Sequence, residues 1–184
     1  MKIERHAIPG VLSIQPAMFS DDRGTFHESW SHERYAAAGL SEVFVQDSVS
    51  RSARGVVRGL HFQSPHAQGK LISVLQGEIL DVAVDIRRDS PTFRQWVAIR
   101  LDHVTGTQFY VPPGCAHGFQ ALSDAAIVHY KCTDYYRPDC ERSIRWSDEA
   151  FGIPWPLAPQ LSAKDAAAPR LRELDEAALP PFAP

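Results

Sequence analysis

Residues 58–63, which read RGLHFQ, are the densest group of side chains in this chain that could do chemistry. Arg58 supplies a cation, His61 a candidate general base and Gln63 an amide, and Lys70 adds a second cation seven residues after Gln63. This combination predicts a site for an anionic or carbonyl-bearing small molecule.

His61 has two interpretations. A neutral histidine, with a pKa near ~6.5, is the side chain best matched to proton removal at neutral pH. The alternative is a strand histidine satisfied by a neighbouring hydrogen bond. A base would need a partner on its other ring nitrogen, and Asp165 is the candidate. Asp165 could instead form a capping box with Ser162, opening a short helix that Pro169 would stop.

Two other positions also keep two interpretations each, and a third residue has one. Tyr130, in the apolar segment 127–131, is either a core tyrosine or a general acid that delivers a proton to a carbanion-like carbon. Tyr136, with Tyr135, offers an aromatic face on which a base could stack. Arg23, with Glu28 nearby, belongs to a solvated turn or grips a phosphate. Side chains must hold any phosphate, because the chain has no glycine-rich phosphate loop.

Strands are expected to position these side chains, because short apolar segments separated by turn residues recur along the chain. The clearest is 80–87, whose even positions are aliphatic and whose odd positions are mostly polar, the alternation of a half-buried strand. Many strands at this spacing predict an all-β sandwich or barrel, and a jelly roll is one of the few ways to close it. The segments are 11–14, 44–46, 70–75, 78–86, 96–101, 108–111 and 126–130.

A convincing early helix is predicted only at 31–38. Ser31 is a suitable N-cap, Glu33 lies in the first turn and Gly39 follows the last turn. The C-terminal 25 residues, 160–184, are rich in Ala, Pro and charge, which predicts short helical turns packed on the outside and a frayed, Pro-rich tail, peripheral from about 170 to 184. Since no repeat or linker is visible, residues 1–184 are expected to form one domain.

The composition argues against several classes of protein. A net charge of −3 and a pI near 6.2, with scattered basic residues, are unlike a nucleic-acid-binding surface. Three cysteines without C-x-x-C spacing indicate neither a disulfide framework nor a zinc site. The chain begins without an apolar leader and has no apolar run long enough to span a membrane, so we expect a cytoplasmic protein.

A second stretch, residues 106–119, has the G-x5-P-x-G-x2-H spacing of the second signature of the cupin superfamily, with His117 as its histidine. In most cupins this histidine binds a metal together with an H-x-H pair and a glutamate. Here Gln63 replaces the second histidine of that pair, and Lys70 replaces the glutamate. A cation at the position of an anionic ligand repels a divalent metal, so neither a metal nor another cofactor is expected.

Together these stretches resemble the dTDP-4-dehydrorhamnose 3,5-epimerase family, from about residue 14 to residue 169. The matching pieces are DRGTFHE (22–28), FVQD (44–47), GVVRGLHFQ (55–63), DSPTF (89–93), PGCAHGF (113–119), IPWP (153–156) and SAKD (162–165). The resemblance implies an all-β, cupin-type jelly roll (double-stranded β-helix) with a few short peripheral helices.

The resemblance also implies a role for each matching residue. His61 would be the general base and Asp165 its partner, Tyr130 would be the general acid, and Lys70 would stabilise negative charge on the sugar C4 oxygen. Tyr136 would be the platform under thymine. Contacts to the substrate or its diphosphate are implied for Arg23, Glu28, Gln46, Ser48, Arg58, His117, Glu141 and Lys164.

One residue departs from the family pattern, since Ser48 stands where the family usually has asparagine two residues after Gln46. The shorter side chain leaves open which sugar is used and how many centres are inverted.

The activity implied is epimerisation of dTDP-4-dehydro-6-deoxy-D-glucose at C3 and C5, giving dTDP-4-dehydro-L-rhamnose, by proton removal alpha to the C4 ketone. One alternative is an epimerase that inverts a single centre of a related nucleotide-activated 4-keto sugar. Another is a non-catalytic cupin that binds a sugar nucleotide. The family also implies a homodimer with exchanged N-terminal strands, in which Arg23 and Glu28 serve the neighbouring subunit's site.

Overall fold

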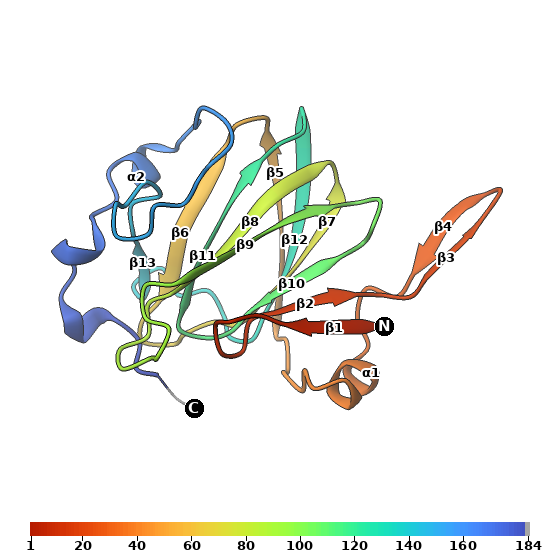
Figure 1. Cartoon of the computed structure of the whole chain (residues 1–184), viewed down its shortest axis with the longest axis horizontal. Coiled ribbons are helices and arrows are strands. Elements are labelled where there is room, and N and C mark those ends of the chain that lie inside the picture. The colour runs from red at the N-terminus through yellow and green to blue at the C-terminus, as the bar shows by residue number, and fades with distance from the viewer. Residues whose placement is uncertain (183–184) are drawn as a thin grey trace.

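The computed structural model describes residues 1–182 and consists mainly of β-strands (Figure 1). The strands are β1 (Lys2–Arg5), β2 (Leu12–Gln15), β3 (Met18–Asp21), β4 (Gly24–His27), β5 (Gln46–Ala53), β6 (Val57–Gln63), β7 (Lys70–Gln76), β8 (Glu78–Asp85), β9 (Trp96–Asp102), β10 (Gln108–Val111), β11 (Cys115–Ala121), β12 (Ala125–Cys132) and β13 (Glu141–Ser143). The helices are α1 (His32–Ala37) and α2 (Ala163–Ala166), and two 3-10 turns follow, η1 (Leu171–Glu173) and η2 (Glu176–Ala178).

The strands form two main sheets and one separate hairpin. The first sheet has the order β1-β2-β10-β7-β12-β5 and the second the order β13-β6-β11-β8-β9, while β3 and β4 form a separate two-stranded sheet. From β5 to β8, and again from β9 to β13, successive strands alternate between the two sheets. All of these pairings are antiparallel, as in a jelly roll. The predicted all-β, cupin-type jelly roll is confirmed.

The main core lies between the two sheets. Side chains from both of them form one buried cluster, with Phe109 and Phe119 among its largest members. A second cluster covers the other face of the second sheet, where Leu60 and Val82 pack against Leu171 and Leu179 of the C-terminal segment. The C-terminal segment is thus a third layer over the sheet, visible beside β6 and β13 in Figure 1.

Strand β8 is buried on both faces, so the prediction of a half-buried strand was wrong. Its even positions, such as Val82 and Val84, contact the C-terminal layer, whereas Ile79 and Ala83 belong to the core between the sheets. The polar odd positions are buried as well. Asp81 and Asp85 are fully inaccessible, because the odd positions of β8 face the first sheet, while the C-terminal layer covers the even positions.

Helix α1 confirms the prediction for residues 31–38. The Ser31 hydroxyl accepts a hydrogen bond from the Arg34 N–H at the N-terminus, and Gly39 follows the C-cap with a φ of +101°. At the other end of the chain, Pro180 is buried and Arg88 forms a bridge with Pro181, so the tail is held against the sheet up to this point. The end of the predicted frayed tail, residues 183–184, lies outside the described residues.

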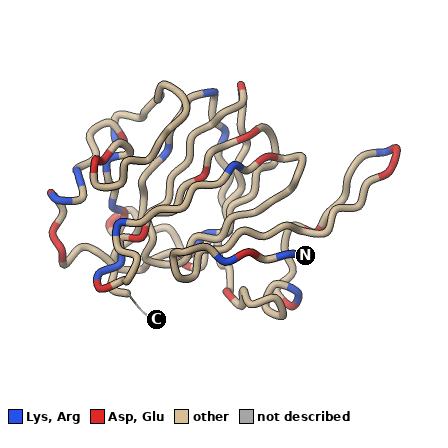
Figure 2. The backbone as a smooth tube through the Cα atoms, viewed as in Figure 1, with Lys and Arg blue, Asp and Glu red and all other residues tan. Residues whose placement is uncertain are grey.

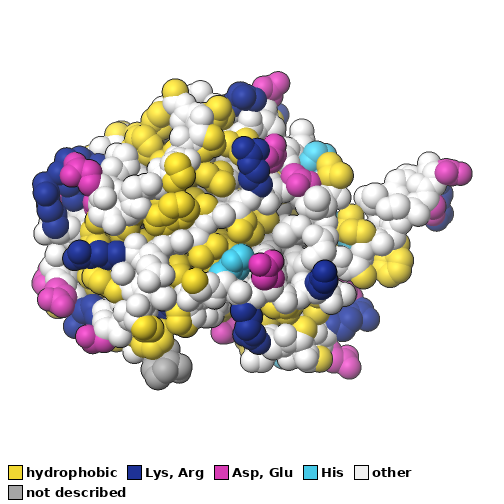
Figure 3. All heavy atoms as spheres, in the orientation of Figure 1, with side chains coloured by type: hydrophobic (Ala, Val, Ile, Leu, Met, Phe, Trp, Pro, Cys, Tyr) yellow, Lys and Arg dark blue, Asp and Glu magenta, His cyan; other side chains and the backbone are white. Residues whose placement is uncertain are grey.

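The hairpin of β3 and β4 projects away from both sheets (Figure 1). Hydrophobic side chains are visible near its base and charged ones at its tip (Figure 3). Elsewhere, cationic and anionic residues are interspersed along the backbone (Figure 2). No helix among residues 1–182 has the length and apolar character needed to cross a bilayer.

Candidate active site

Strands of both sheets line a cavity of about 320 Å³. Most of its lining consists of residues that the sequence analysis singled out: Gln46, Ser48, Arg58, His61, Lys70, His117, Tyr130 and Tyr136. The side chains come from β5, β6, β7, β11 and β12 and from the loop after β12. A polar cavity in the middle of a sandwich is a candidate ligand site, because the sheets around it hold its walls in place.

A β-bulge at Gly59 lets two residues of the RGLHFQ stretch face the same cavity. Arg58 and His61 are three positions apart, which in a regular strand would place them on opposite faces. The pairing with β11 shifts by one residue here, because His61 pairs with His117 whereas Arg58 pairs with Phe119. Gly59 has a φ of +139°, and a Cβ atom there would lie 2.5 Å from the Cα of Gly118. Only glycine fits the bulge.

His61 and Asp165 are joined by a hydrogen bond of 2.5 Å between Nε2 and Oδ1. Asp165 is buried, and its other carboxylate oxygen accepts a hydrogen bond of 2.9 Å from the Ser162 hydroxyl. The same hydroxyl accepts the Asp165 backbone N–H at the start of α2. Asp165 therefore fits both interpretations, since one side chain belongs to the cap and also contacts the histidine.

The ionised carboxylate of Asp165 determines which tautomer a neutral His61 adopts. Burial tends to raise the pKa of Asp165, but the hydrogen bonds from His61 and Ser162 and the charge of Lys164 outweigh it and hold that pKa below its usual value. An ionised carboxylate can only accept, so a neutral His61 donates its Nε2–H. This tautomer leaves the Nδ1 lone pair as the basic atom.

The Tyr130 phenol lines the cavity with its oxygen 2.9 Å from the Ser50 hydroxyl. Its ring packs in a T-shaped arrangement on His117, with the centroids 6.2 Å apart. Burial raises the pKa of Tyr130, and the hydrogen bond with Ser50 opposes this only in part. The phenol therefore stays protonated at neutral pH and can act as a proton donor.

Two cations border the cavity. Lys70 is half-buried, and burial lowers the pKa of its ammonium group below that of an ordinary lysine. The acidic groups of Cys132, Glu141 and Asp81 offset this only in part. Among the described residues no hydrogen bond or salt bridge holds the Lys70 ammonium, so it remains available to a ligand. Arg58 is held by hydrogen bonds of 3.0 Å from its Nε to the Ser52 hydroxyl and 3.3 Å from Nη2 to the Arg51 carbonyl.

His117 forms a second buried histidine–aspartate pair, at 2.6 Å from its Nε2 to Oδ1 of Asp81. The sequence analysis did not identify Asp81. It was one of the polar odd positions of the 80–87 segment, and those positions were expected to face water. A buried carboxylate needs a hydrogen-bond partner. If β8 had been predicted as buried on both faces, Asp81 would have been expected to pair with a polar side chain such as His117.

The thymine platform proposed at Tyr136 is connected to strand β5. The Tyr136 backbone N–H donates to the Gln46 side-chain oxygen at 2.8 Å, and the Gln46 amide donates to the Ser48 hydroxyl at 3.2 Å. The Tyr136 phenol donates to Glu141 at 2.9 Å, and Glu141 forms an ion pair with Lys164. Glu141 and Lys164 thus lie beside the cavity and not in its lining.

Arg23 and Glu28 lie away from the cavity. Arg23 is at the tip of the hairpin, its side chain is 89% exposed, and its one ion pair within residues 1–182 is with Asp21. Glu28 follows β4 and accepts a hydrogen bond of 2.8 Å from the Nε of Arg34 in α1. Within one chain the structure does not bring these two residues to the other candidate site residues.

Three lining residues, Gln68, Phe119 and Cys132, were not predicted. Each is two positions from a predicted site residue, and alternate residues of a strand face the same side. This period was the signal that could have found Phe119 on β11 and Cys132 on β12.

Gln63, by contrast, contacts backbone groups outside the cavity lining, including the carbonyl of His66 at 2.7 Å. Within residues 1–182, no group of three or more His, Cys, Asp or Glu side chains could hold a metal ion.

The fold is a cupin-type jelly roll, and the comparisons with known proteins place the chain among epimerases. The family model described as dTDP-4-dehydrorhamnose 3,5-epimerase matches residues 5–173, and the chain belongs to this family of isomerases. The dTDP-4-dehydrorhamnose 3,5-epimerase of Salmonella typhimurium is 50% identical over 175 residues, which cover 93% of this chain and 96% of the relative.

Two solved structures are also similar. The crystal structure of dTDP-6-deoxy-D-glucose-3,5-epimerase from Legionella pneumophila Philadelphia 1, in complex with dTDP-4-keto-L-rhamnose, has a TM-score of 0.96 and 49% identity, and covers 100% of this chain and 99% of that one. A 3′-monoepimerase from Streptomyces bikiniensis, in complex with dTDP-quinovose, has a TM-score of 0.89 and 35% identity, covering 96% of this chain and 91% of that one.

Proposed function

We propose that this chain epimerises dTDP-4-dehydro-6-deoxy-D-glucose at C3 and C5 to give dTDP-4-dehydro-L-rhamnose. The observation that carries the proposal is that an oriented base, His61, and a protonated phenol, Tyr130, line one cavity. Epimerisation needs both, since a base that returns a proton to the face it came from inverts nothing. The relative solved with dTDP-4-keto-L-rhamnose supports this choice of sugar nucleotide.

The reaction begins with His61. Its Nδ1 removes the proton from a carbon next to the C4 ketone, and the resulting imidazolium is stabilised by the ionised Asp165 on the other ring nitrogen. Such acid–base assistance contributes about 10²–10⁴-fold to rate.

The electron pair left on carbon moves to the C4 oxygen and forms an enolate. The Lys70 ammonium, with no protein partner among the described residues, is the cation placed to stabilise that oxygen. The guanidinium of Arg58 adds positive charge from the facing strand. Because both positive charges stand in the cavity before the negative charge develops, stabilisation of the enolate is expected to be the largest contribution to rate.

Tyr130 completes the reaction by donating its phenolic proton to the carbanion from the face opposite His61. A non-catalytic binding protein would need neither a base nor a buried phenol. The nucleotide would be held by the aromatic face of Tyr136, with the diphosphate held by side chains, since the chain has no phosphate-binding loop.

Product analysis in deuterated water tests the proposal directly. Incubation with dTDP-4-dehydro-6-deoxy-D-glucose should place deuterium at both C3 and C5 and give the inverted sugar, as read by proton NMR. Binding without exchange at either carbon would refute the enzymatic proposal and leave a sugar-nucleotide-binding protein.

A second candidate, inversion of one centre only, is favoured by one observation. Ser48 stands where the family usually has asparagine, and its hydroxyl is occupied by the Gln46 amide at 3.2 Å. The relative described as a 3′-monoepimerase supports this alternative at 35% identity. Deuterium at C3 alone in the same NMR experiment would select it.

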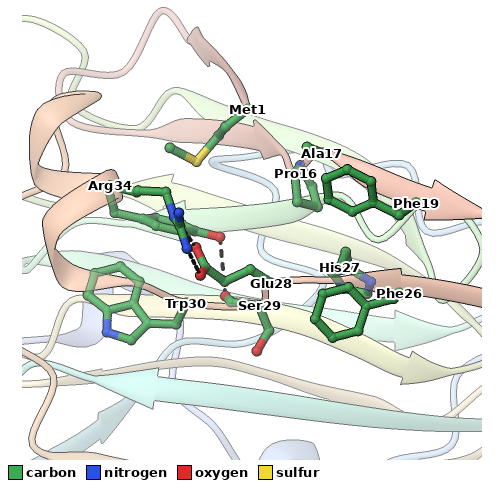
Figure 4. Close-up of a pocket in the computed structure, with 11 residues that line it drawn as sticks. Met1, Pro16, Ala17, Phe19, Phe26, His27, Glu28, Ser29, Trp30 and Arg34 are labelled. Atoms are coloured by element: carbon green, nitrogen blue, oxygen red, sulfur yellow. Dashed lines mark hydrogen bonds and ion pairs between the residues drawn. The ribbon is translucent and has the colours of Figure 1, made fainter.

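We further propose that two copies exchange their N-terminal hairpins. Phe19 and Phe26 pair across the hairpin yet are 64% and 71% exposed, and a lone two-stranded hairpin is at best marginally stable in water. At its base lies a hollow of about 560 Å³, where Glu28 faces Arg34 (Figure 4). A second copy of this chain would bury these apolar side chains and bring Arg23 to its neighbour's cavity.

Subunit mixing tests the exchange. Arg23→Ala and His61→Ala subunits, each inactive alone, should regain about a quarter of the parent activity when mixed equally, because roughly half of the dimers are mixed and each has one complete site. No recovery after confirmed subunit exchange would mean that Arg23 does not complete the neighbouring site.

A further inference from the structure

Strand β5 presents a polar face to the cavity, and the proposed function uses only part of it. Its odd positions, such as Val49, are exposed, whereas Gln46, Ser48, Ser50 and Ser52 are half-buried or buried. Neither Ser50 nor Ser52 was predicted from the sequence or used in the proposed mechanism. Ser52 accepts a hydrogen bond from Arg58, whereas Ser50 contacts Tyr130.

The register between β5 and β12 brings Ser50 to the end of the Tyr130 side chain. Tyr130 is directly opposite Ser48, and Ser50 is opposite Val128, so Ser50 is the diagonal neighbour of Tyr130 on the same face. Diagonal neighbours have Cβ atoms roughly 7–8 Å apart, a span that a tyrosine can bridge. The phenol therefore lies along the sheet, and its oxygen meets the Ser50 hydroxyl at 2.9 Å.

This contact is the single hydrogen bond recorded for the Tyr130 oxygen among residues 1–182. The ring itself is held by packing against His117 and Phe119. Packing fixes the plane of the ring, but the direction in which the O–H points is set by its hydrogen-bond partner.

We propose that Ser50 is a positioning residue for proton donation by Tyr130, and that it determines how often the enolate is reprotonated on the inverting face. The inference rests on the proposed function. The Ser50 hydroxyl donates to the phenol oxygen, which frees the phenolic hydrogen to point into the cavity. In the transfer step the Tyr130 O–H bond breaks, a C–H bond forms with the enolate electron pair, and a phenolate remains.

The Ser50 hydroxyl stabilises the Tyr130 phenolate more than it stabilises the neutral phenol. Burial disfavours this anion, so the donor on its oxygen contributes more after the transfer than before it. After each transfer, water restores the proton to Tyr130 and the imidazolium of His61 returns its proton to solvent, so both groups are ready for the second centre. No other reactant is needed.

The test compares the rate of inversion with the rate of deuterium incorporation from solvent. For Ser50→Ala, deuterium should still enter at C3, because His61 and Lys70 are untouched. The number of inversions per deuterium incorporated should fall about tenfold or more, the effect expected from losing a hydrogen bond to a charged group. Ser50→Thr keeps the hydroxyl and suits a strand, so it should restore most of the parent ratio.

Two comparisons separate positioning from a loss of structure. In a Tyr130→Phe background, Ser50→Ala should have no further effect on the ratio, because the group on which it acts is gone. Ser73→Ala is a matched control on the neighbouring strand β7, where Ser73 accepts a hydrogen bond of 2.8 Å from Gln108 and does not line the cavity. It should leave the ratio unchanged.

Equal losses of exchange and inversion in Ser50→Ala, or an undiminished effect in the Tyr130→Phe background, would overturn the proposal for Ser50 alone. A parent chain that neither exchanges nor inverts the sugar would refute the proposed function, and the inference would fall with it.

Discussion

Replacing Asp165 by asparagine should remove the base function of His61 while leaving the fold largely intact. The carboxylate accepts two hydrogen bonds, from His61 at 2.5 Å and from Ser162 at 2.9 Å. An amide has only one accepting oxygen. If that oxygen faces Ser162, the amide NH₂ faces His61 Nε2 and stabilises the tautomer with hydrogen on Nδ1, which cannot accept a proton.

The size of the effect follows from these two contributions. A hydrogen bond to a charged group is worth about 1.5–3 kcal/mol, which corresponds to a rate loss of about 10- to 150-fold. The wrong tautomer can remove the whole contribution of a general base, about 10²–10⁴-fold. We therefore expect kcat of Asp165→Asn to fall by about 10²–10⁴, with deuterium exchange at C3 and C5 falling in parallel.

Stability should respond with a defined pH dependence. The pKa of Asp165 is lower in the folded chain than in the unfolded one, so its stabilising contribution is present above the unfolded pKa of ~3.9 and is lost as the pH falls through the folded value. Asp165→Asn should thus lower Tm at pH 7, and the difference from the parent should shrink below about pH 4.

Asp148→Asn is the matched control for this experiment. Asp148 is also a buried carboxylate of the C-terminal layer, and it accepts the Leu171 backbone N–H at 2.6 Å. Its replacement should lower Tm and leave kcat close to the parent value. If Asp165→Asn kept the parent rate of exchange while remaining folded, His61 would not depend on Asp165, and the assignment of the base would be wrong.

Three further predictions concern other residues of the cavity. Tyr130→Phe should stay folded and still incorporate deuterium, while inversion, at least at C5, becomes slow; His61→Ala should do neither, and parent-like inversion in Tyr130→Phe would make the tyrosine a core residue. Lys70→Met should lower kcat by about 10²–10³-fold, as expected when a group that stabilises an oxyanion is removed. It should also raise Tm, because burying the ammonium costs free energy. In the parent, activity should decline as Lys70 loses its charge, at a pH below the pKa of an ordinary lysine. Dialysis against a strong chelator should leave turnover unchanged, because Gln63 and Lys70 occupy the cupin ligand positions; a large loss restored by a divalent ion would contradict this.

The sequence predicted the elements whose cause is local. Helix α1 was recognisable because Ser31 and Gly39 mark its ends within a few residues. Six of the predicted apolar segments correspond to β2, β7, β8, β9, β10 and β12, because their pattern and the turn residues around them are also local signals.

Strand β5 was missed because its residues, QDSVSRSA, are exposed on one face and line the cavity on the other, so neither face is apolar. The prediction of a strand at 44–46 was wrong except at Gln46, where β5 begins. A strand that lines a polar cavity lacks the signal by which buried strands are found.

The part of the candidate site that lies in sequence motifs was predictable. His61, Lys70 and His117 lie in recognisable stretches, and they line one cavity. The contact between His61 and Asp165 could not be derived from the residues themselves, because it joins positions 104 apart and the local sequence favours a helix cap equally well. Asp81 was missed because burial of a strand on both faces depends on layers that only the tertiary structure supplies.

The 104-residue separation of His61 and Asp165 also sets when the protein becomes active during its synthesis. The last strand of the jelly roll, β13, ends at Ser143, so every strand can be complete while Asp165 has yet to be made. At roughly 5–20 residues per second, a ribosome needs about 1–4 s to extend the chain over the residues between Ser143 and Asp165. Throughout that interval a nascent chain has its cavity but no oriented base, and cannot act on substrate in the cell.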